Sequence, residues 1–279
     1  MFFQYLIIDT YFVILKLNLN IYIYTMPTYV IRHGYRLSYE FDKDIIKSNK
    51  LKDIEYINRY TQTDGIDEPL GPRGHIESIK TGKNLSKLLD FSKPIKVYCS
   101  PMTRCVQTAR HIVDELRKDN PDIKICIEYN LAEKLHMDRN YIFKNNEVNV
   151  KLHKYAMMNG TRYNTPIDDF LSLKNIIKRN ENYIDKTYKS TVSRQSYLVD
   201  DYMLDCFELA AKCYTQMKLD NDDNNIIITH ALQCVGIYGY LQKKINNVDQ
   251  KPFWYKNGTN ITFGWDKKII YGPTRDFLE

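Results

Sequence analysis

Short apolar runs alternate along the chain with longer segments in which apolar residues recur at the spacing of an α-helix. Runs rich in β-branched or aromatic residues predict strands at residues 28–31, 97–99 and 226–229. A short hairpin around Asp266-Lys267 is predicted at residues 261–265 and 268–271. Helical patterns cover about residues 74–89, 104–118, 168–189, 197–217 and 233–241. We expect one α/β domain with three α/β/α layers and a mainly parallel central sheet.

Residues that can carry chemistry stand where the predicted strands end. The tripeptide Arg32-His33-Gly34 follows the first run, and His230 follows the third. After the second run, a Ser-Pro turn leads into a helix that opens near Arg104, where free backbone N–H groups and the helix dipole favour an anion. A further strand leads into the acidic loop 127–133. Because such strand ends meet at the carboxyl edge of an open α/β sheet, we expect one ligand site there.

Taken in order, these four segments resemble the histidine phosphatase superfamily, which includes the cofactor-dependent phosphoglycerate mutases. The resemblance spans residues 27 to about 272 and is strongest at residues 32–36 and 98–109. Residues 97–109 are particularly similar to the phosphatase domains of the suppressor-of-T-cell-receptor-signalling proteins. In that branch a further phosphate-binding arginine follows the histidine three residues on, and Arg36 stands at that place here.

The chemistry that these residues suit is the attack of a histidine on a phosphate monoester. Neutral imidazole is a better nucleophile than hydroxide near pH 7 because its unperturbed pKa is ~6.5. We therefore expect His33 to form a phosphohistidine that water then hydrolyses. Arg32, Arg36 and Arg104 are expected to hold the phosphate oxygens, since a guanidinium matches phosphate as a fork. We expect His230 to add a contact as charge shifts in the transition state.

The candidate for the general acid is Glu133, which would protonate the leaving oxygen and later accept a proton from water. Its spacing after the preceding strand fits the family, whereas Glu128, Asp138 and Glu147 are nearby alternatives. The three arginines and His230 supply the positive charge that a metal ion would otherwise supply. We therefore expect no metal ion and no other cofactor.

A cysteine nucleophile fits the sequence less well. Cys99 precedes Arg104 with four residues between them, one fewer than the phosphate loop of a protein tyrosine phosphatase has. Pro101 also removes a backbone N–H group that such a loop needs. We expect Cys105 to lie in the core. Two other histidines lie in helical patterns and are expected to be ordinary helix residues: His75 and His111.

The composition agrees with an intracellular enzyme. The chain has 279 residues, and its 43% hydrophobic and 27% charged residues are ordinary for a soluble globular protein. The net charge of +6 is compatible with an anionic substrate, and no basic run accompanies it, so we expect no nucleic-acid partner. Six cysteines without metal-type spacing are interpreted as reduced thiols, and we expect a cytoplasmic location.

Two segments stand apart from the rest of the predicted domain. Residues 1–25 are apolar and aromatic with polar interruptions, and they lack the basic start and cleavage site of a signal peptide. We favour Met26 as the main start, with a membrane anchor or an added edge strand as alternatives, and we do not expect membrane association. The histidine phosphatase domain is expected at residues 26–279. The resemblance implies that the polar insertion at about 134–195 is a helical lid over the active site.

These expectations together predict the hydrolysis of phosphate monoesters. The substrate would be a phosphorylated small molecule or a phosphoprotein. One alternative is a phosphoglycerate mutase, although the acidic residue, serine and Trp-Asn that follow Arg-His-Gly in mutases are replaced at residues 35–40. Another alternative is a non-catalytic module that binds phosphorylated ligands. Retention of both histidines, the three arginines and Glu133 argues against that alternative.

Overall fold

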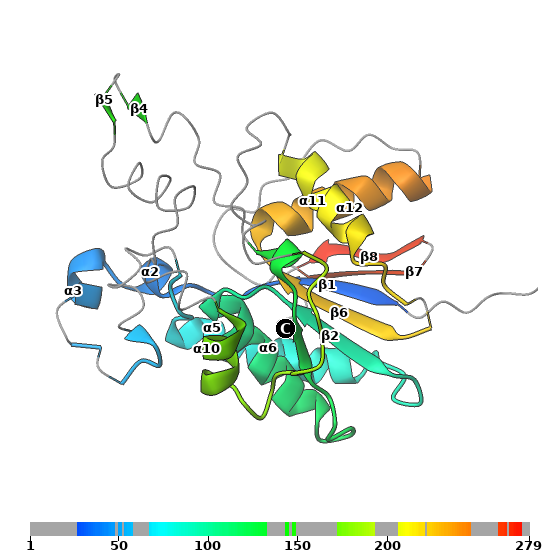
Figure 1. Ribbon diagram of the computed structural model, residues 1–279, viewed down its shortest axis with the longest axis horizontal. Helices are drawn as coiled ribbons and strands as arrows, with labels where there is room; N and C mark the ends of the chain where they lie inside the picture. Colours follow the sequence, from blue (N-terminus) through cyan, green and yellow to red (C-terminus); the bar gives the residue numbers. More distant parts are fainter. Residues whose placement is uncertain are drawn as a thin grey trace, which may run out of the picture.

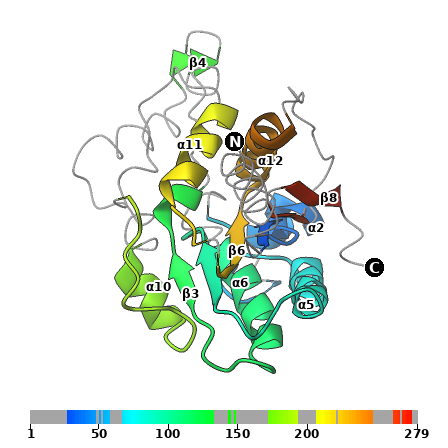
Figure 2. The same ribbon diagram turned by 90° about the vertical axis from the view of Figure 1, so that its right-hand side faces the viewer.

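The computed structural model describes residues 27–47, 50–51, 53–57, 67–132, 143–144, 147–148, 172–192, 206–220, 222–246, 262–266 and 268–274. These residues form a six-stranded sheet with helices on both faces (Figure 1). A second view shows the two helical layers on either side of the strands (Figure 2). The predicted three-layer α/β/α class is confirmed.

The strands of the main sheet follow one another in the order β3-β2-β6-β1-β7-β8. They are β1 (Thr28–Arg32), β2 (Ile95–Cys99), β3 (Ile125–Ile127), β6 (Asn224–Thr229), β7 (Thr262–Asp266) and β8 (Lys268–Thr274). Strands β3, β2, β6 and β1 are parallel. Strand β7 pairs antiparallel with β1, and β8 pairs antiparallel with β7, which forms the predicted hairpin. Strands β4 (Phe143–Lys144) and β5 (Glu147–Val148) pair separately.

The helices form a layer on each face of the sheet (Figure 1). One layer contains α5 (Pro72–Ser86), α6 (Thr103–Leu116) and α10 (Leu173–Arg179), and the other contains α11 (Cys206–Gln216) and α12 (Ala231–Asn246). Shorter helical turns are α2 (Leu37–Glu40), α3 (Lys43–Lys47) and the 3₁₀ helix η1 (Tyr129–Leu131). Helix α5 begins at a proline, whose fixed φ suits the first helical turn.

Alternate residues of each central strand enter different cores, because successive side chains point to opposite faces of a sheet. Ile31 and Ile228 pack with α5 and α6, whereas Val30 and Ile227 pack with α11 and α12. All four side chains are fully buried. Each contributes roughly 1.5–3 kcal/mol relative to an exposed position, so the two cores hold the central strands rigidly under the site.

The helix predicted at residues 168–189 is much shorter in the structure. Helix α10 ends where the Asn180 N–H donates to the carbonyl groups of the preceding turn. Beyond it, Ile184 forms a parallel bridge with Ile125, and the Asp185 N–H donates to the Ile125 carbonyl at 2.9 Å. Pairing with the edge strand β3 therefore replaces the helix that the local pattern predicts. Residues 206–216 of the helix predicted at 197–217 form α11, and residues 197–205 lie outside the described ranges.

Two predictions extend beyond the described residues. Residues 172–192 of the predicted insertion lie beside β3, while most of the insertion at 134–195 is not described, so its role as a lid stays a prediction. Residues 1–26 are also outside the described ranges. Within those ranges, no helix combines the length and the apolar character needed to span a membrane.

Candidate active site

The register of three parallel strands brings the strand-end residues to one edge of the sheet. Ile228 of β6 pairs with Ile31 of β1 on one side and with Cys99 of β2 on the other. Three residues directly follow these strands: His33, Ser100 and His230. The ring centroids of His33 and His230 are 5.2 Å apart, and the ring planes are inclined at 63°. The predicted convergence of the two motif histidines is present in the structure.

His33 is buried and held in one tautomer. Its Nδ1 atom lies 2.8 Å from the carbonyl oxygen of Gly34. A carbonyl only accepts, so Nδ1 carries the proton and Nε2 keeps its lone pair. Burial, followed by the nearby charges of Arg104, Arg32 and His230, holds the pKa of His33 well below its ordinary value of 6.5. The ring is therefore neutral near pH 7, and Nε2 can act as a nucleophile.

Gly34 allows the turn after β1 to pack closely against α5. A side-chain carbon at Gly34 would lie 2.5 Å from the carbonyl oxygen of Gly74, and one at Gly74 would overlap the carbonyl oxygen of Tyr35. The Gly34 N–H also donates to the Thr108 hydroxyl of α6 at 3.0 Å. These contacts fix the turn, and with it the orientation of the His33 ring.

Arg104 lies fully buried in the first turn of α6, as the sequence predicted. Its Nη2 atom is 3.3 Å from Nδ1 of His230. Because a guanidinium only donates, this nitrogen accepts and the proton of His230 is on Nε2, which lies 2.9 Å from the Ser100 hydroxyl. Arg32, at the end of β1, is 7% exposed. The charges of both buried arginines act on His33, so both lie near the histidine pair.

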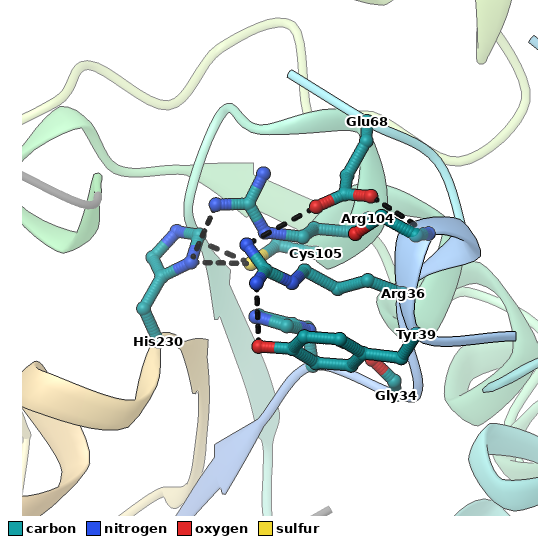
Figure 3. A network of polar contacts seen from close by, with 9 residues as sticks. Gly34, Arg36, Tyr39, Glu68, Arg104, Cys105 and His230 are labelled. Carbon is teal, nitrogen blue, oxygen red and sulfur yellow. Dashed lines mark hydrogen bonds and ion pairs between the residues drawn. The ribbon is translucent and has the colours of Figure 1, made fainter. Parts of the chain in front are cut away.

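Arg36 stands at the N-cap of α2, and 24% of its side chain is exposed. Its Nη1 atom is 3.1 Å from a Glu68 oxygen, and its Nη2 atom donates to the Tyr39 hydroxyl. The guanidinium also lies over the Tyr39 ring, 4.3 Å from its centroid. Figure 3 shows the guanidinium groups of Arg36 and Arg104 extending toward the side of His230.

Two buried carboxylates near the site were not identified from the sequence. Asp67 is fully buried and accepts hydrogen bonds from the Thr103 N–H at 2.6 Å and the Thr103 hydroxyl at 2.8 Å. Glu68 accepts from the Ser38 N–H at 3.0 Å in addition to its ion pair with Arg36. The sequence signal for them is a pair of adjacent acidic residues before a Pro-Leu-Gly turn, which alone is typical of a solvated loop.

Glu133 and Asp138 lie outside the described residues, and for Glu147 only the backbone of β5 is described. The remaining alternative acid, Glu128, is fully buried. Its carboxylate accepts from the Asn130 and Thr191 N–H groups and from the hydroxyls of Tyr188 and Ser190. These four donors tie the 188–191 segment to η1, so Glu128 has a structural role.

Cys99, the alternative nucleophile considered from the sequence, is not suited to that role. Burial raises the pKa of the Cys99 thiol well above its ordinary value of 9.0, so a protonated thiol is present near pH 7. Cys105 lies in the hydrophobic core, as predicted, and its Sγ atom is 3.4 Å from Nε2 of His230. Among the described residues, no group of three or more His, Cys, Asp or Glu side chains is arranged to hold a metal ion.

Comparisons with known proteins identify the family and the fold. A family model described as "Histidine phosphatase superfamily (branch 1)" matches residues 29–196. The crystal structure of the ecdysone phosphate phosphatase from Bombix mori in complex with tungstate aligns with a TM-score of 0.54 and 20% identity. The alignment covers 88% of this chain and 92% of that chain, which shows a shared fold.

A second solved structure aligns with a lower TM-score. The phosphoserine phosphatase from Entamoeba histolytica in complex with 3-phosphoglyceric acid has a TM-score of 0.40 and 14% identity. That alignment covers 91% of this chain and all of the other, 100%. No curated protein sequence matches this chain. The expected closeness to the suppressor-of-T-cell-receptor-signalling branch stays a prediction.

Proposed function

The chain belongs to branch 1 of the histidine phosphatase superfamily, and we propose that it hydrolyses phosphate monoesters through a phosphohistidine on His33. The observation that carries the proposal is the state of the His33 ring. Its proton is held by the Gly34 carbonyl, and burial together with the nearby charges of Arg104 and Arg32 lowers its pKa, so Nε2 keeps its lone pair. This is the arrangement that a nucleophilic histidine needs at neutral pH.

Two chemical steps complete the reaction. Nε2 of His33 attacks phosphorus in line with the ester bond, so the N–P bond forms as the P–O bond breaks and Glu133 gives its proton to the leaving oxygen. Water then attacks the phosphohistidine and loses a proton to the Glu133 carboxylate. The N–P bond breaks, and inorganic phosphate and the neutral ring are released.

The proposed phosphate ligands are Arg32, Arg36 and Arg104. A phosphate monoester carries nearly two negative charges near pH 7, and buried guanidinium groups offset both the charge and the repulsion of the nucleophile. His230 accepts from Arg104 through Nδ1 and thereby orients that guanidinium. Its ring also lies next to His33, where it can add a contact to the phosphoryl group as charge shifts during transfer.

The proposed role of Glu133 has two supports. The Nδ1 proton of His33 is held by the Gly34 carbonyl and the Nε2 proton of His230 lies at the Ser100 hydroxyl, so a third group is the better source of the proton for the leaving oxygen. The residue before Glu133 is also held at the site, because the Ala132 carbonyl accepts from the Gln233 side chain at 2.7 Å. Gln233 lies in the first turn of α12, directly after His230 and β6.

Turnover of p-nitrophenyl phosphate tests the proposal most directly. We expect steady release of phosphate by the full chain, and no loss of rate with EDTA because side chains supply the positive charge. A panel of a steroid phosphate, a phosphotyrosine peptide and phosphorylated metabolites would then define the substrate class. The steroid ester is included because the Bombix mori structure is that of an ecdysone phosphate phosphatase. Phosphate binding without turnover of any ester would instead indicate a non-catalytic module.

A coupled assay separates hydrolysis from mutase chemistry. A mutase has to return the phosphoryl group to bound product before water attacks, and it depends on a bisphosphoglycerate primer. Arg36 adds a cation at the phosphate site in place of the mutase pattern, so we expect negligible interconversion of 2- and 3-phosphoglycerate with or without primer. Primer-dependent isomerisation faster than phosphate release would contradict the phosphatase proposal and leave His33 as the nucleophile.

A further inference from the structure

Two adjacent carboxylates before α5 contact two different elements that carry phosphate-binding arginines. Asp67 accepts from Thr103, the residue before Arg104, and Glu68 forms the ion pair with Arg36. We propose that Glu68 is a positioning residue, which holds Arg36 in the orientation that receives a phosphoryl oxygen. The inference rests on the proposed function, since it takes Arg36 to be a phosphate ligand.

The backbone fixes Glu68 relative to Arg36. The Leu37 N–H donates to the Pro69 carbonyl at 3.1 Å, and Arg36 forms an isolated antiparallel bridge with Leu70. The segment that carries the carboxylate is therefore joined to the segment that carries the guanidinium on the main chain as well as through side chains. Asp67 anchors the same segment to α6, so its position is set from two sides.

The Glu68 side chain is itself held in one orientation. It is 2% exposed, and its two oxygens have different donors, with Oε1 on Arg36 and Oε2 on the Ser38 N–H. Rotation of the carboxylate away from Arg36 would break a buried hydrogen bond to the backbone. A carboxylate fixed in this way presents one oxygen to Arg36 before any substrate arrives.

Arg36 needs such support more than Arg104 does. The Arg104 side chain is fully buried and confined by packing, whereas that of Arg36 is 24% exposed. A partly exposed arginine has many rotamers and loses that freedom when it binds a ligand. The ion pair with Glu68 and the contacts with Tyr39 order the guanidinium in advance (Figure 3).

The direction in which phosphate affinity changes when Glu68 is neutralised distinguishes positioning from competition. A carboxylate close to an anion site repels phosphate and also occupies a donor that phosphate could use. If Glu68 merely competes for Arg36, its neutralisation should tighten phosphate binding. If Glu68 positions Arg36, the same change should weaken phosphate binding despite the loss of a negative charge.

The experiment is a double-mutant cycle on the dissociation constant of inorganic phosphate, measured by titration calorimetry on the full chain. Glu68→Gln keeps the size of the side chain and an acceptor for Ser38. We expect it to raise the dissociation constant roughly three- to thirtyfold in the wild-type background and less than about twofold in the Arg36→Ala background. In turnover assays the loss should appear mainly in KM.

Two further variants make the test independent of folding and charge. Glu68→Asp keeps the charge but shortens the reach, and it should weaken phosphate binding in the same Arg36-dependent way. Glu55→Gln is the matched control, because it removes a carboxylate from the ion pair with Arg110, whose two atoms are 2.7 Å apart. It should leave phosphate binding unchanged. A thermal melt of each variant verifies folding.

Tighter or unchanged phosphate binding in Glu68→Gln and Glu68→Asp would overturn the inference. Equal fold losses with and without Arg36 would overturn it too, because the effect would then not pass through that arginine. Failure of the proposed function looks different: the wild-type chain would turn over no ester, while phosphate binding would still report the coupling of Glu68 to Arg36.

Discussion

Two histidine pairs in this molecule share a ring geometry and differ in their surroundings. The ring centroids are 5.2 Å apart for His33 and His230, and 5.0 Å apart for His75 and His111. Burial is the main cause that lowers the pKa of His33 and of both rings in the second pair. A close histidine pair with a lowered pKa is therefore not sufficient evidence of an active site.

The hydrogen-bond partners make the difference. In the helical pair, Nδ1 of His75 and Nε2 of His111 are 2.7 Å apart, so each ring uses the other as its partner between α5 and α6. In the site pair, His33 donates to a backbone carbonyl and keeps its second nitrogen for a ligand. Only the site pair has a nucleophilic lone pair next to buried arginines, and this is what points to catalysis.

The largest expected effect separates the two pairs by activity. His33→Ala should lower the turnover of p-nitrophenyl phosphate by at least about 10⁴-fold, because the nucleophile is removed. His111→Ala removes a ring from the other pair and should leave turnover within about twofold, as expected for a helix residue away from the reaction. Steady-state assays of both purified variants are the measurement.

Trapping the covalent intermediate identifies the residue that carries the phosphoryl group. A rapid quench of the wild-type chain should leave phosphate on His33 as an acid-labile, base-stable adduct, the signature of a P–N bond. An adduct on Cys99, or full activity in His33→Ala, would contradict the proposed mechanism. A comparable loss in His111→Ala would break the distinction between the two pairs.

The next largest effect concerns the general acid, because we expect neither ring of the site pair to supply the proton for the leaving oxygen. An aryl phosphate with a good leaving group needs little protonation, whereas an alkyl phosphate needs much more. Glu133→Gln should therefore lower kcat/KM for an alkyl phosphate by about 10²–10⁴-fold and affect p-nitrophenyl phosphate much less. Equal losses on both esters would exclude Glu133 as the acid and make His136 the next residue to substitute.

The sequence predicted those parts of the site that local patterns determine. His33, Arg104 and His230 each follow a recognisable strand, and the carboxyl edge of a parallel sheet brings such positions together. The β7–β8 hairpin and the core position of Cys105 follow from equally local signals. The roles of these residues in catalysis stay predictions until the substitutions are made.

Contacts between distant segments were not predictable from the sequence. Glu68 finds Arg36 only because two loops pair, and Asp67 reaches Thr103 across 36 positions of the chain. The local sequence pattern predicts a helix from Asn180 to Ile184, but pairing with β3 determines the conformation of this region. The local sequence pattern does not contain these tertiary contacts. At residues 180–184 the contact also outweighs the local preference for a helix.

The smallest expected effect is a pH dependence of stability that arises in the helical pair. Burial, then the neighbouring His75 and Arg110, lowers the pKa of His111 to about 4, and Asp114 and Glu55 act in the opposite direction. In the unfolded chain the pKa of His111 returns to about 6.5. Between these values the unfolded state binds a proton that the folded state does not, so stability decreases as the pH falls.

The variant His111→Gln removes this titration and keeps a polar side chain opposite His75. The melting temperature of the wild-type chain should fall more than that of the variant between about pH 7 and about pH 5, by roughly 2–4 °C because partial exposure screens the effect. Thermal melts of both proteins at the two pH values give the difference directly. Above the ordinary histidine pKa both states are neutral at this position, so the pH dependence there should be the same in the two proteins. An identical decrease on acidification would mean that His111 is protonated in the folded chain as readily as in the unfolded one, and the two pairs would then differ in protonation as well as in partners.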